Sequence, residues 1–286
     1  MKLALVQMRM DQEREKNIEK ALSFIRKASN DGANIVCLPE LFDSRYFPQT
    51  PRKKEEDERS NAIDYLTEKI PGETTRVLSE SARENRIVLI GGSIFERGVK
   101  GAYNTSVVFD DTGKMIGKYR KVHIPNDESF YEQDYFQPGS SYPVFNTKFG
   151  RLGVLICFDQ WYPEAARMMR LKGAEMIFYP TAIGRVKGIE EKEGDWRSSW
   201  EAVQRGHAIA NSVVVASVNR VGKEGDMNFW GGSFVYDQFG TLLARGGSKE
   251  EEVLHADVDL SLQAEVEEGW GFLRNRKPET YSKISK

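Results

Sequence analysis

The feature of this chain that most constrains its fold is an alternation between short apolar runs rich in β-branched residues and longer segments of helical periodicity. The apolar runs are bounded by turn residues, as strands buried on both faces of a sheet are. They are Leu3–Val6, Ile35–Leu38, Ile87–Ile90, Val154–Ile156, Met176–Tyr179 and Val213–Val218. Apolar residues at three- and four-residue spacing predict helices over Arg14–Ser29, Thr74–Glu84, Pro163–Leu171 and Trp196–Ala210. The alternation predicts an α/β layered fold.

Two further pairs of strands are predicted as hairpins, because a short turn motif separates the members of each pair. Asp111–Gly113 lies between Ser106–Asp110 and Met115–Tyr119, and Asp237–Gly240 lies between Ser233–Tyr236 and Thr241–Ala244. Hairpins are antiparallel, so the sheets are expected to be mixed. The combination favours two sheets stacked face to face with helices outside, although the pattern alone leaves a doubly wound single sheet as an alternative.

The composition is that of a globular protein with a sizeable core, with 286 residues of which 40% are hydrophobic and 29% charged. A single domain over residues 1–286 is expected, because α/β domains of this size fold around one core. The 41 basic and 43 acidic side chains nearly balance, which gives no electrostatic reason to expect nucleic acid or an anionic membrane as a partner. The expected partner is a small-molecule substrate.

The cysteines and the first residues bear on location. Cys37 and Cys157 are too few for a disulfide framework, and both end apolar runs, as reduced thiols do. Lys2–Met8 is too short for the apolar core of a signal peptide, and no run approaches eighteen apolar residues. These features predict a reducing, cytoplasmic location.

Three polar residues stand at or just beyond the ends of predicted strands. Glu40 follows the run that begins at Ile35, Lys121 follows Met115–Arg120, and Cys157 ends the run that begins at Arg151. Because α/β folds gather catalytic groups at strand ends, a base, a cation and a nucleophile are expected to meet there.

These residue types fit one chemistry. A cysteine attacks as thiolate, so it needs a base or a cation close by near neutral pH, and Glu40 and Lys121 supply one of each. Attack on an amide or ureido carbon makes the carbonyl oxygen negative. A fixed ammonium and a backbone N–H, such as that of Phe158, would stabilise this oxyanion.

Each of these residues alone has a more ordinary interpretation. A lone cysteine at a strand end is most often a buried core thiol, which is our interpretation of Cys37. Glu40 alone is typical of a carboxylate at a helix start, and Lys121 alone of a solvated cation. A Cys–His dyad that uses His123 is a minor alternative, whereas His207 is expected to pack inside its helix.

The sequence predicts neither a metal nor a cofactor. Its three histidines are scattered, and no Cys/His pair has metal-ligand spacing. The glycine pairs Gly91–Gly92 and Gly231–Gly232 lack the flanking pattern of a phosphate-binding loop.

Taken together, three segments of the chain resemble the signature segments of the nitrilase, or carbon–nitrogen hydrolase, superfamily. They are Leu38–Leu41, Gly117–Pro125 and Gly153–Asp159. The resemblance runs from the first strand to Pro278, and it implies an αββα four-layer sandwich. It also implies a catalytic Glu–Lys–Cys triad, carried onto Glu40, Lys121 and Cys157. A second glutamate of the family, ahead of a Tyr-Phe-x-Pro-Gly segment, matches Glu132, which would orient Lys121 or the substrate.

Within the superfamily, the segments Cys157–Arg167 and Phe178–Gly184 resemble the N-carbamoylputrescine amidases most closely. Relatives that act on N-carbamoyl amino acids use paired arginines after the nucleophile loop to hold a carboxylate. Gln160 and Trp161 stand there instead, and Trp161 suits a cationic amine better than a carboxylate, unless it merely packs beneath the site. The residues expected to contact substrate are Tyr131, Gln160, Trp161, Thr181 and Ala182.

The segment Arg185–Gly194 is a candidate lid, because it is charged and lies between a strand and a helix. Two interpretations of the acidic side chains in and after it are open: they serve solubility alone, or they complement an ammonium group. They are Glu190, Glu191, Glu193 and Asp195.

The sequence therefore supports three hypotheses of function. The first is hydrolysis of N-carbamoylputrescine, or a related ureido amine, to putrescine, carbon dioxide and ammonia. The second keeps the triad but acts on a simple amide, an ω-amide or a nitrile, and the third is an inactive scaffold or binding protein. The resemblance also implies a homo-oligomer, a dimer at least, in which the aromatic segment Trp270–Arg274 and the rest of residues 260–286 contact a neighbouring subunit.

Overall fold

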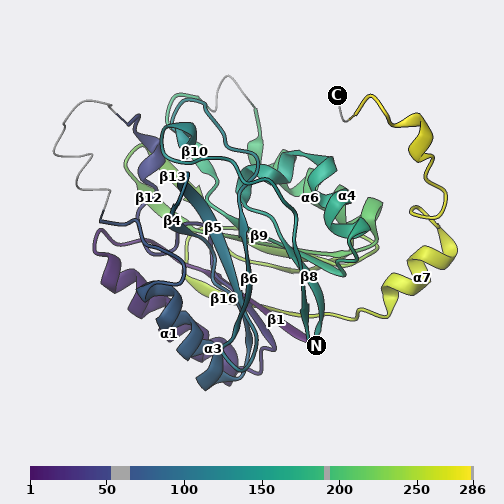
Figure 1. Ribbon diagram of the computed structural model, residues 1–286, viewed down its shortest axis with the longest axis horizontal. Helices are drawn as coiled ribbons and strands as arrows, with labels where there is room; N and C mark the ends of the chain where they lie inside the picture. Colours follow the sequence, from purple (N-terminus) through teal and green to yellow (C-terminus); the bar gives the residue numbers. More distant parts are fainter. Residues whose placement is uncertain (53–64, 190–193, 285–286) are drawn as a thin grey trace.

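The computed structural model describes residues 1–52, 65–189 and 194–284. Its core is two mixed sheets packed face to face, with helices on the two outer faces (Figure 1). The first sheet has the strand order β16 (Glu252–Asp257), β1 (Lys2–Gln7), β2 (Ile35–Cys37), β3 (Val88–Ile90), β5 (Gly101–Phe109), β4 (Ile94–Gly98), and β6 (Met115–Arg120) also pairs with β5. The four-layer αββα arrangement is confirmed, and the single doubly wound sheet is excluded.

The second sheet contains the strands around the expected nucleophile. Its order is β15 (Leu242–Arg245), β14 (Phe234–Tyr236), β11 (Val214–Asn219), β9 (Met176–Thr181), β8 (Gly150–Val154) and β7 (Val144–Thr147). A small third sheet joins β10 (Gly184–Val186), β13 (Met227–Trp230) and β12 (Val221–Glu224). Both predicted hairpins, β5–β6 and β14–β15, are present with antiparallel pairing.

The alternation of side chains along β1 explains how the layers hold together. Leu3 and Leu5 face the second sheet and belong to its core, whereas Ala4 and Val6 face outward under the helices of the first sheet. Successive strand residues point to opposite faces, so one strand contributes to two apolar cores.

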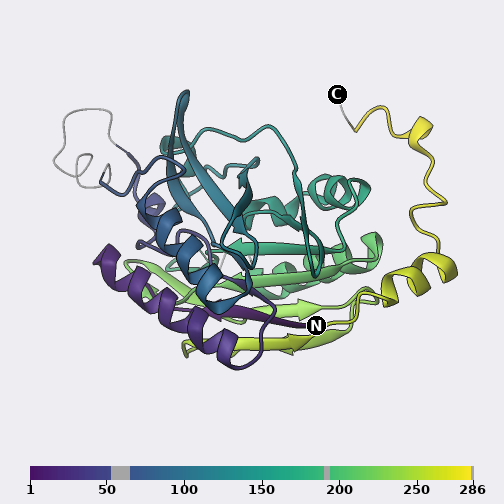
Figure 2. The same ribbon diagram turned by 60° about the horizontal axis from the view of Figure 1, so that its bottom comes forward.

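The helices lie where the periodicity predicts them. α1 (Arg14–Asn30) and α3 (Glu73–Asn85) pack side by side on the first sheet, as Figure 2 shows. α4 (Pro163–Leu171) and α6 (Trp196–Asn211) cover the second sheet. One expected strand is wrong in its bounds: β8 ends at Val154 rather than continuing to Ile156, because the chain turns there into the 3₁₀ helix that begins at Cys157.

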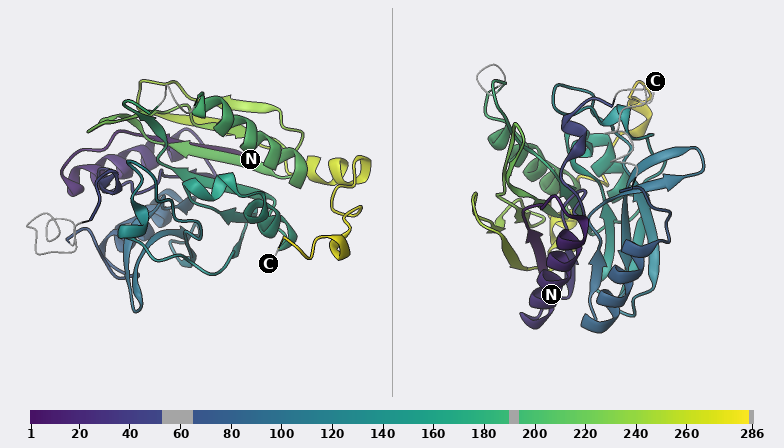
Figure 3. Two further views of the ribbon diagram at one scale, coloured as in Figure 1. Left: turned by 90° about the horizontal axis from the view of Figure 1, so that it is seen from above. Right: turned by 90° about the vertical axis from the view of Figure 1, so that its left-hand side faces the viewer.

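The C-terminal chain leaves the sandwich. α7 (Leu262–Gly269) and the residues after it extend beyond the ends of the sheets (Figure 3). Across the described residues, no helix has the length and apolarity needed to cross a membrane.

Candidate active site

Glu40 lies in the segment that follows β2, and its side chain is fully buried. Its Oε1 accepts hydrogen bonds from Asn104 Nδ2 at 2.8 Å and from Lys121 Nζ at 2.9 Å. Oε2 is buried and, among the residues that the structure describes, has no hydrogen-bond partner. One oxygen of Glu40 is therefore held in place, while the other remains available to accept a proton.

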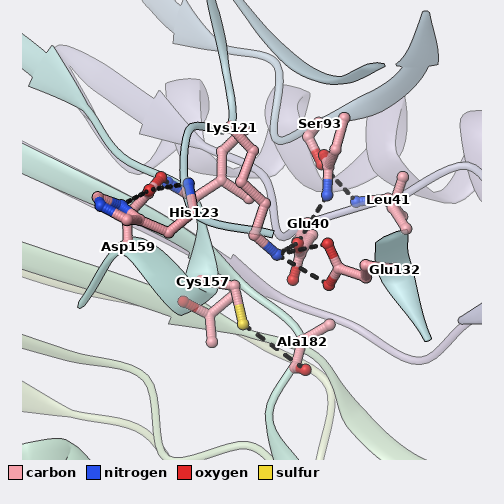
Figure 4. A network of polar contacts seen from close by, with 12 residues as sticks. Glu40, Leu41, Ser93, Lys121, His123, Glu132, Cys157, Asp159 and Ala182 are labelled. Atoms are coloured by element: carbon pink, nitrogen blue, oxygen red, sulfur yellow. Dashed lines mark hydrogen bonds and ion pairs between the residues drawn. The ribbon is translucent and has the colours of Figure 1, made fainter. Parts of the chain in front are cut away.

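The backbone around Glu40 is closely packed. Gly92 has φ +58°, and a Cβ at this position would lie 2.1 Å from the carbonyl oxygen of Pro39, so only glycine allows the approach. Leu41 has φ 46°, and its N–H donates to Ser93 Oγ at 2.9 Å (Figure 4). These contacts fix the position from which the Glu40 side chain projects.

Lys121 follows β6 and is fully buried between two carboxylates. Its Nζ lies 2.9 Å from Glu40 Oε1 and 2.8 and 2.7 Å from the two oxygens of Glu132. Burial alone would lower the pKa of Lys121, but the charges of Glu132 and Glu40 outweigh it and raise the pKa above its ordinary value. Lys121 is therefore a permanent cation.

Glu132 begins the 3₁₀ helix Glu132–Asp134 and completes this cluster. Tyr46 Oη donates to Glu132 Oε1 at 2.7 Å, and both side chains are buried. Burial is the main cause that raises the pKa of Glu132 to about 7, against the lowering effect of Lys121.

Cys157 opens the 3₁₀ helix Cys157–Trp161 with φ 41°, a left-handed conformation that is unusual for a residue with a side chain. Figure 4 shows its sulfur below the Glu40–Lys121–Glu132 cluster, at 3.9 Å from the carbonyl oxygen of Ala182. Burial, followed by the charge of Glu40, raises the pKa of the Cys157 thiol well above its ordinary value. Burial therefore favours the neutral thiol over the thiolate at this position.

Asp159 fixes the turn that presents Cys157. It is buried and accepts hydrogen bonds from Ile156 N at 2.8 Å and Tyr119 Oη at 2.7 Å. His123 contributes its backbone N–H at 3.0 Å and its ring Nδ1 at 2.7 Å, and the ring stacks on Tyr162. Within the described ranges no hydrogen bond joins His123 to Cys157, so the geometry favours Glu40 over His123 as the base.

A cavity of about 740 Å³ opens onto this cluster. Cys157 and Glu132 line it, together with Phe158, Gln160 and Trp161 from the same 3₁₀ helix as Cys157. Asp127, Glu128, Lys187 and Trp196 also contribute to its wall. Lys187–Ile189 belong to the candidate lid segment, whereas Glu190, Glu191 and Glu193 lie outside the described residues.

The residues expected to contact substrate divide into two groups. Gln160 and Trp161 line the cavity, and Gln160 Oε1 accepts from Trp200 Nε1 at 2.8 Å. Tyr131 and Thr181 are not among the residues that line it. The Thr181 hydroxyl instead donates to the carbonyl oxygen of Tyr179, and the Tyr131 N–H donates to the carbonyl oxygen of Pro48.

Two other expected residues have different roles from those predicted. Ala182 faces Cys157 with its backbone carbonyl and is not part of the cavity wall. Asp195 caps α6, where its side chain accepts from Ser198 N at 3.1 Å, so a helix start explains this acidic residue without a ligand.

Two predictions about buried residues are confirmed. Cys37 is buried in the core, where burial alone raises the pKa of its thiol. His207 is buried in α6, and its Nε2 lies 2.7 Å from the carbonyl oxygen of Gln160.

Several residues of the site were not predicted from the sequence. They are Tyr46, Asn104, Asp127, Glu128, Asp159 and Arg220. Arg220 carried a usable signal, because it is a charged residue directly after the apolar run Val213–Val218 and Asn219, as Lys121 is after its own strand. Asp127 and Glu128 lie in an irregular loop, where no periodicity marks a position.

Comparisons with known proteins identify the family of this chain. The family model described as carbon–nitrogen hydrolase matches residues 2–268. The chain is 40% identical to N-carbamoylputrescine amidase of Solanum lycopersicum over 93% of this chain and 88% of that protein. It is 34% identical to citrullinase of Francisella tularensis over 99% of this chain and 97% of that one.

A solved structure gives the same result for the fold. The carbon–nitrogen hydrolase of Helicobacter pylori G27 superposes with a TM-score of 0.92 at 38% identity, over 100% of this chain and 98% of that one. The fold and the family match define a hydrolase of carbon–nitrogen bonds. The chain belongs to the carbon–nitrogen hydrolase family, the nitrilase superfamily.

Proposed function

We propose that this enzyme hydrolyses a ureido amine of the N-carbamoylputrescine type, with Cys157 as nucleophile, Glu40 as base and Lys121 as oxyanion partner. The observation that carries the proposal is Oε2 of Glu40, which has no hydrogen-bond partner in the described part of the chain and belongs to a buried cluster beside the Cys157 thiol. A carboxylate with one oxygen fixed and the other unbonded suits a general base.

In the first half of the reaction the sulfur attacks the ureido carbon while Glu40 takes the thiol proton. A C–S bond forms, and the electron pair of the C=O bond moves to oxygen. Lys121 and the Phe158 N–H stabilise this oxyanion. When it collapses, one C–N bond breaks, and the departing nitrogen takes the proton from Glu40.

The second half removes the acyl group from Cys157. Glu40, again unprotonated, takes a proton from water as the water oxygen attacks the same carbon. Collapse breaks the C–S bond and the sulfur recovers the proton. The released carbamic acid decomposes to carbon dioxide and the second nitrogen product, ammonia or the amine. The complete reaction therefore consumes one water molecule.

The charge of the cavity wall supports a substrate with a cationic end. Asp127 and Glu128 line the cavity and outnumber its cation Lys187, and Phe158 and Trp161 offer apolar surface for a short methylene chain. A carboxylate pair attracts an ammonium group and repels a substrate carboxylate. The name of the Solanum relative agrees with this substrate class.

The test is ammonia release from N-carbamoylputrescine, N-carbamoyl-β-alanine, a simple amide and a nitrile, with wild type and Cys157→Ala measured in parallel. We expect Cys157-dependent turnover that prefers N-carbamoylputrescine. Turnover confined to the amide or nitrile would retain the cysteine chemistry and overturn the substrate. Turnover of the ureido amine by Cys157→Ala would overturn the mechanism.

We also propose that the chain forms at least a dimer through residues 260–286. Trp270 and Phe272 are 44% and 39% exposed on a segment that extends beyond the sandwich (Figure 3). Exposed neighbouring aromatic side chains of this kind mark contact surfaces. Sedimentation should give a dimer or larger species that Trp270→Ser/Phe272→Ser dissociates, and a wild-type monomer at micromolar concentration would exclude the proposal.

A further inference from the structure

Arg220 and Glu224 form a buried ion pair that the proposed reaction does not use. Arg220 lies between β11 and β12, Glu224 ends β12, and their side chains are 0% and 2% exposed. Arg220 Nη1 lies 2.9 and 3.1 Å from the two carboxylate oxygens. Burying two charges is costly, so the pair needs further contacts to compensate.

Within the described residues, the other side-chain hydrogen bonds of the pair go to one segment, residues 40–46. Arg220 Nη2 donates to the carbonyl oxygens of Glu40 at 2.7 Å and Leu41 at 2.8 Å, and Nη1 lies 3.3 Å from that of Ser44. Glu224 Oε2 accepts the Tyr46 N–H at 2.7 Å. A planar guanidinium has several donors in a fixed geometry, so it can hold consecutive carbonyl groups that no helix or sheet pairs.

The clamped segment carries two members of the catalytic cluster. Glu40 reaches Lys121, and Tyr46 reaches Glu132, so both carboxylates of the cluster depend on the backbone of residues 40–46. Leu41, the residue after Glu40, has φ 46°, a conformation that a leucine keeps only where its surroundings impose it. A shift of this backbone would move the Glu40 side chain away from its place beside Cys157.

We propose that Arg220 and Glu224 are positioning residues for catalysis, which hold the backbone of residues 40–46 so that Glu40 faces Cys157. This proposal rests on the proposed role of Glu40 as base. Neither residue lines the cavity, so they act on the chemical step rather than on substrate binding.

The test compares Arg220→Lys and Glu224→Gln with wild type, each at matched folded concentration. Lysine keeps the charge but loses the fork that spans the carbonyl groups of Glu40 and Leu41. Glutamine keeps the shape of Glu224 but not its charge. We expect kcat to fall at least tenfold in both variants, with KM within threefold of wild type.

Glu96→Gln is the matched control for the loss of a buried charge. Glu96 is 2% exposed and pairs with Lys118 and Arg120, but it makes no hydrogen bond to residues 40–46 in the described structure. We expect this variant to unfold at a lower temperature while kcat stays within twofold of wild type. An equal fall in kcat in Glu96→Gln would show a general loss of stability and would overturn the positioning role.

One reference variant, Glu40→Gln, distinguishes a failure of this proposal from a failure of the proposed mechanism. If Glu40→Gln retains activity, the base has been assigned wrongly. If Glu40→Gln is inactive while folded Arg220→Lys or Glu224→Gln keeps the wild-type kcat, the role of Glu40 as base is retained and the positioning role of the ion pair is wrong. Should Arg220→Lys fail to fold, the smaller change Glu224→Gln tests the proposal alone. In either variant, an increase in KM with an unchanged kcat would contradict the proposal.

Discussion

The catalytic cavity has two regions of opposite character. Its floor, which we define as Glu132 and Cys157 of the cavity wall together with Glu40 and Lys121 behind them, is buried. Hydrogen bonds shorter than 3 Å join the lysine to both carboxylates. Its rim, defined as Asp127, Glu128 and Lys187, is exposed. A buried network is organised before substrate arrives, whereas exposed charges are screened by water. We therefore expect changes in the floor to alter the reaction itself, and changes in the rim to alter the choice of substrate.

Removing the base from the floor should have the largest effect. Glu40→Gln keeps the size of the side chain and an acceptor for Lys121 and Asn104, but an amide cannot take the thiol proton. General base catalysis contributes roughly 10²- to 10⁴-fold, so we expect kcat to fall by about 10³-fold. Steady-state kinetics with circular dichroism as a folding control checks this, and a loss below tenfold would contradict the role of Glu40.

Changing the other carboxylate of the floor should have a smaller and pH-dependent effect. Burial raises the pKa of Glu132 to about 7, so acid neutralises one of the two groups that hold Lys121. We expect the wild-type kcat to fall as pH drops below 7, with an apparent pKa that belongs to the coupled cluster. Glu132→Gln should lower kcat by roughly 10- to 100-fold, because a hydrogen bond to a charged group contributes about 1.5–3 kcal/mol.

The shape of the pH profile distinguishes this role from a purely structural one. Glutamine does not titrate, so the acid limb of Glu132→Gln should move to lower pH than that of wild type. Identical acid limbs in the two proteins would show that another group controls the rate below pH 7.

The rim should respond to the charge of the substrate and hardly at all to the reaction. Exposed charge pairs contribute up to about 1 kcal/mol each, so Asp127→Asn/Glu128→Gln should raise KM for N-carbamoylputrescine by roughly tenfold. n-Pentylurea, which replaces the ammonium group by a methyl group, is the matched substrate, and its KM should change less than twofold. Added salt should reduce the difference between the two substrates in wild type. Equal changes in KM for the two substrates would show that the rim does not recognise the charge of the substrate.

Three of the four floor residues have a local signal in the sequence, whereas Glu132 was expected only from the resemblance to the nitrilase superfamily. Glu40, Lys121 and Cys157 follow apolar strands, and the sheet brings strand ends together whatever the loops do. Tyr46 has no such signal, and the position of Arg220 directly after an apolar run does not tell which groups it binds. In both cases the partner lies far away in sequence: Tyr46 donates to Glu132, and Arg220 donates to the Glu40 backbone carbonyl. Thr181, at the end of β9, was expected to contact substrate, but its hydroxyl donates to the Tyr179 carbonyl oxygen. The sequence does not determine the direction of this side chain.

Cys37 is a buried thiol whose pKa is raised by burial alone, so it can be compared with Cys157. Its removal should have the smallest effect on kcat of the substitutions considered. Cys37 and Cys157 are both buried, and burial raises the pKa of both thiols. Cys37 lies within regular β2 and packs in the core, whereas Cys157 begins a turn at φ 41° and faces the cavity. Deleting one buried sulfur should lower the free energy of unfolding by about 1 kcal/mol, the scale of a small cavity.

Cys37→Ala should therefore keep kcat and KM within about twofold of wild type while its unfolding midpoint falls. Alkylation of the folded enzyme by iodoacetamide should stop in Cys157→Ala and continue unchanged in Cys37→Ala, because only one of the two thiols reaches the cavity. A Cys37→Ala enzyme with a low kcat and normal stability would contradict this prediction. It would mean that core packing around β2 affects the position of the floor residues, although no hydrogen bond in the described residues joins Cys37 to them.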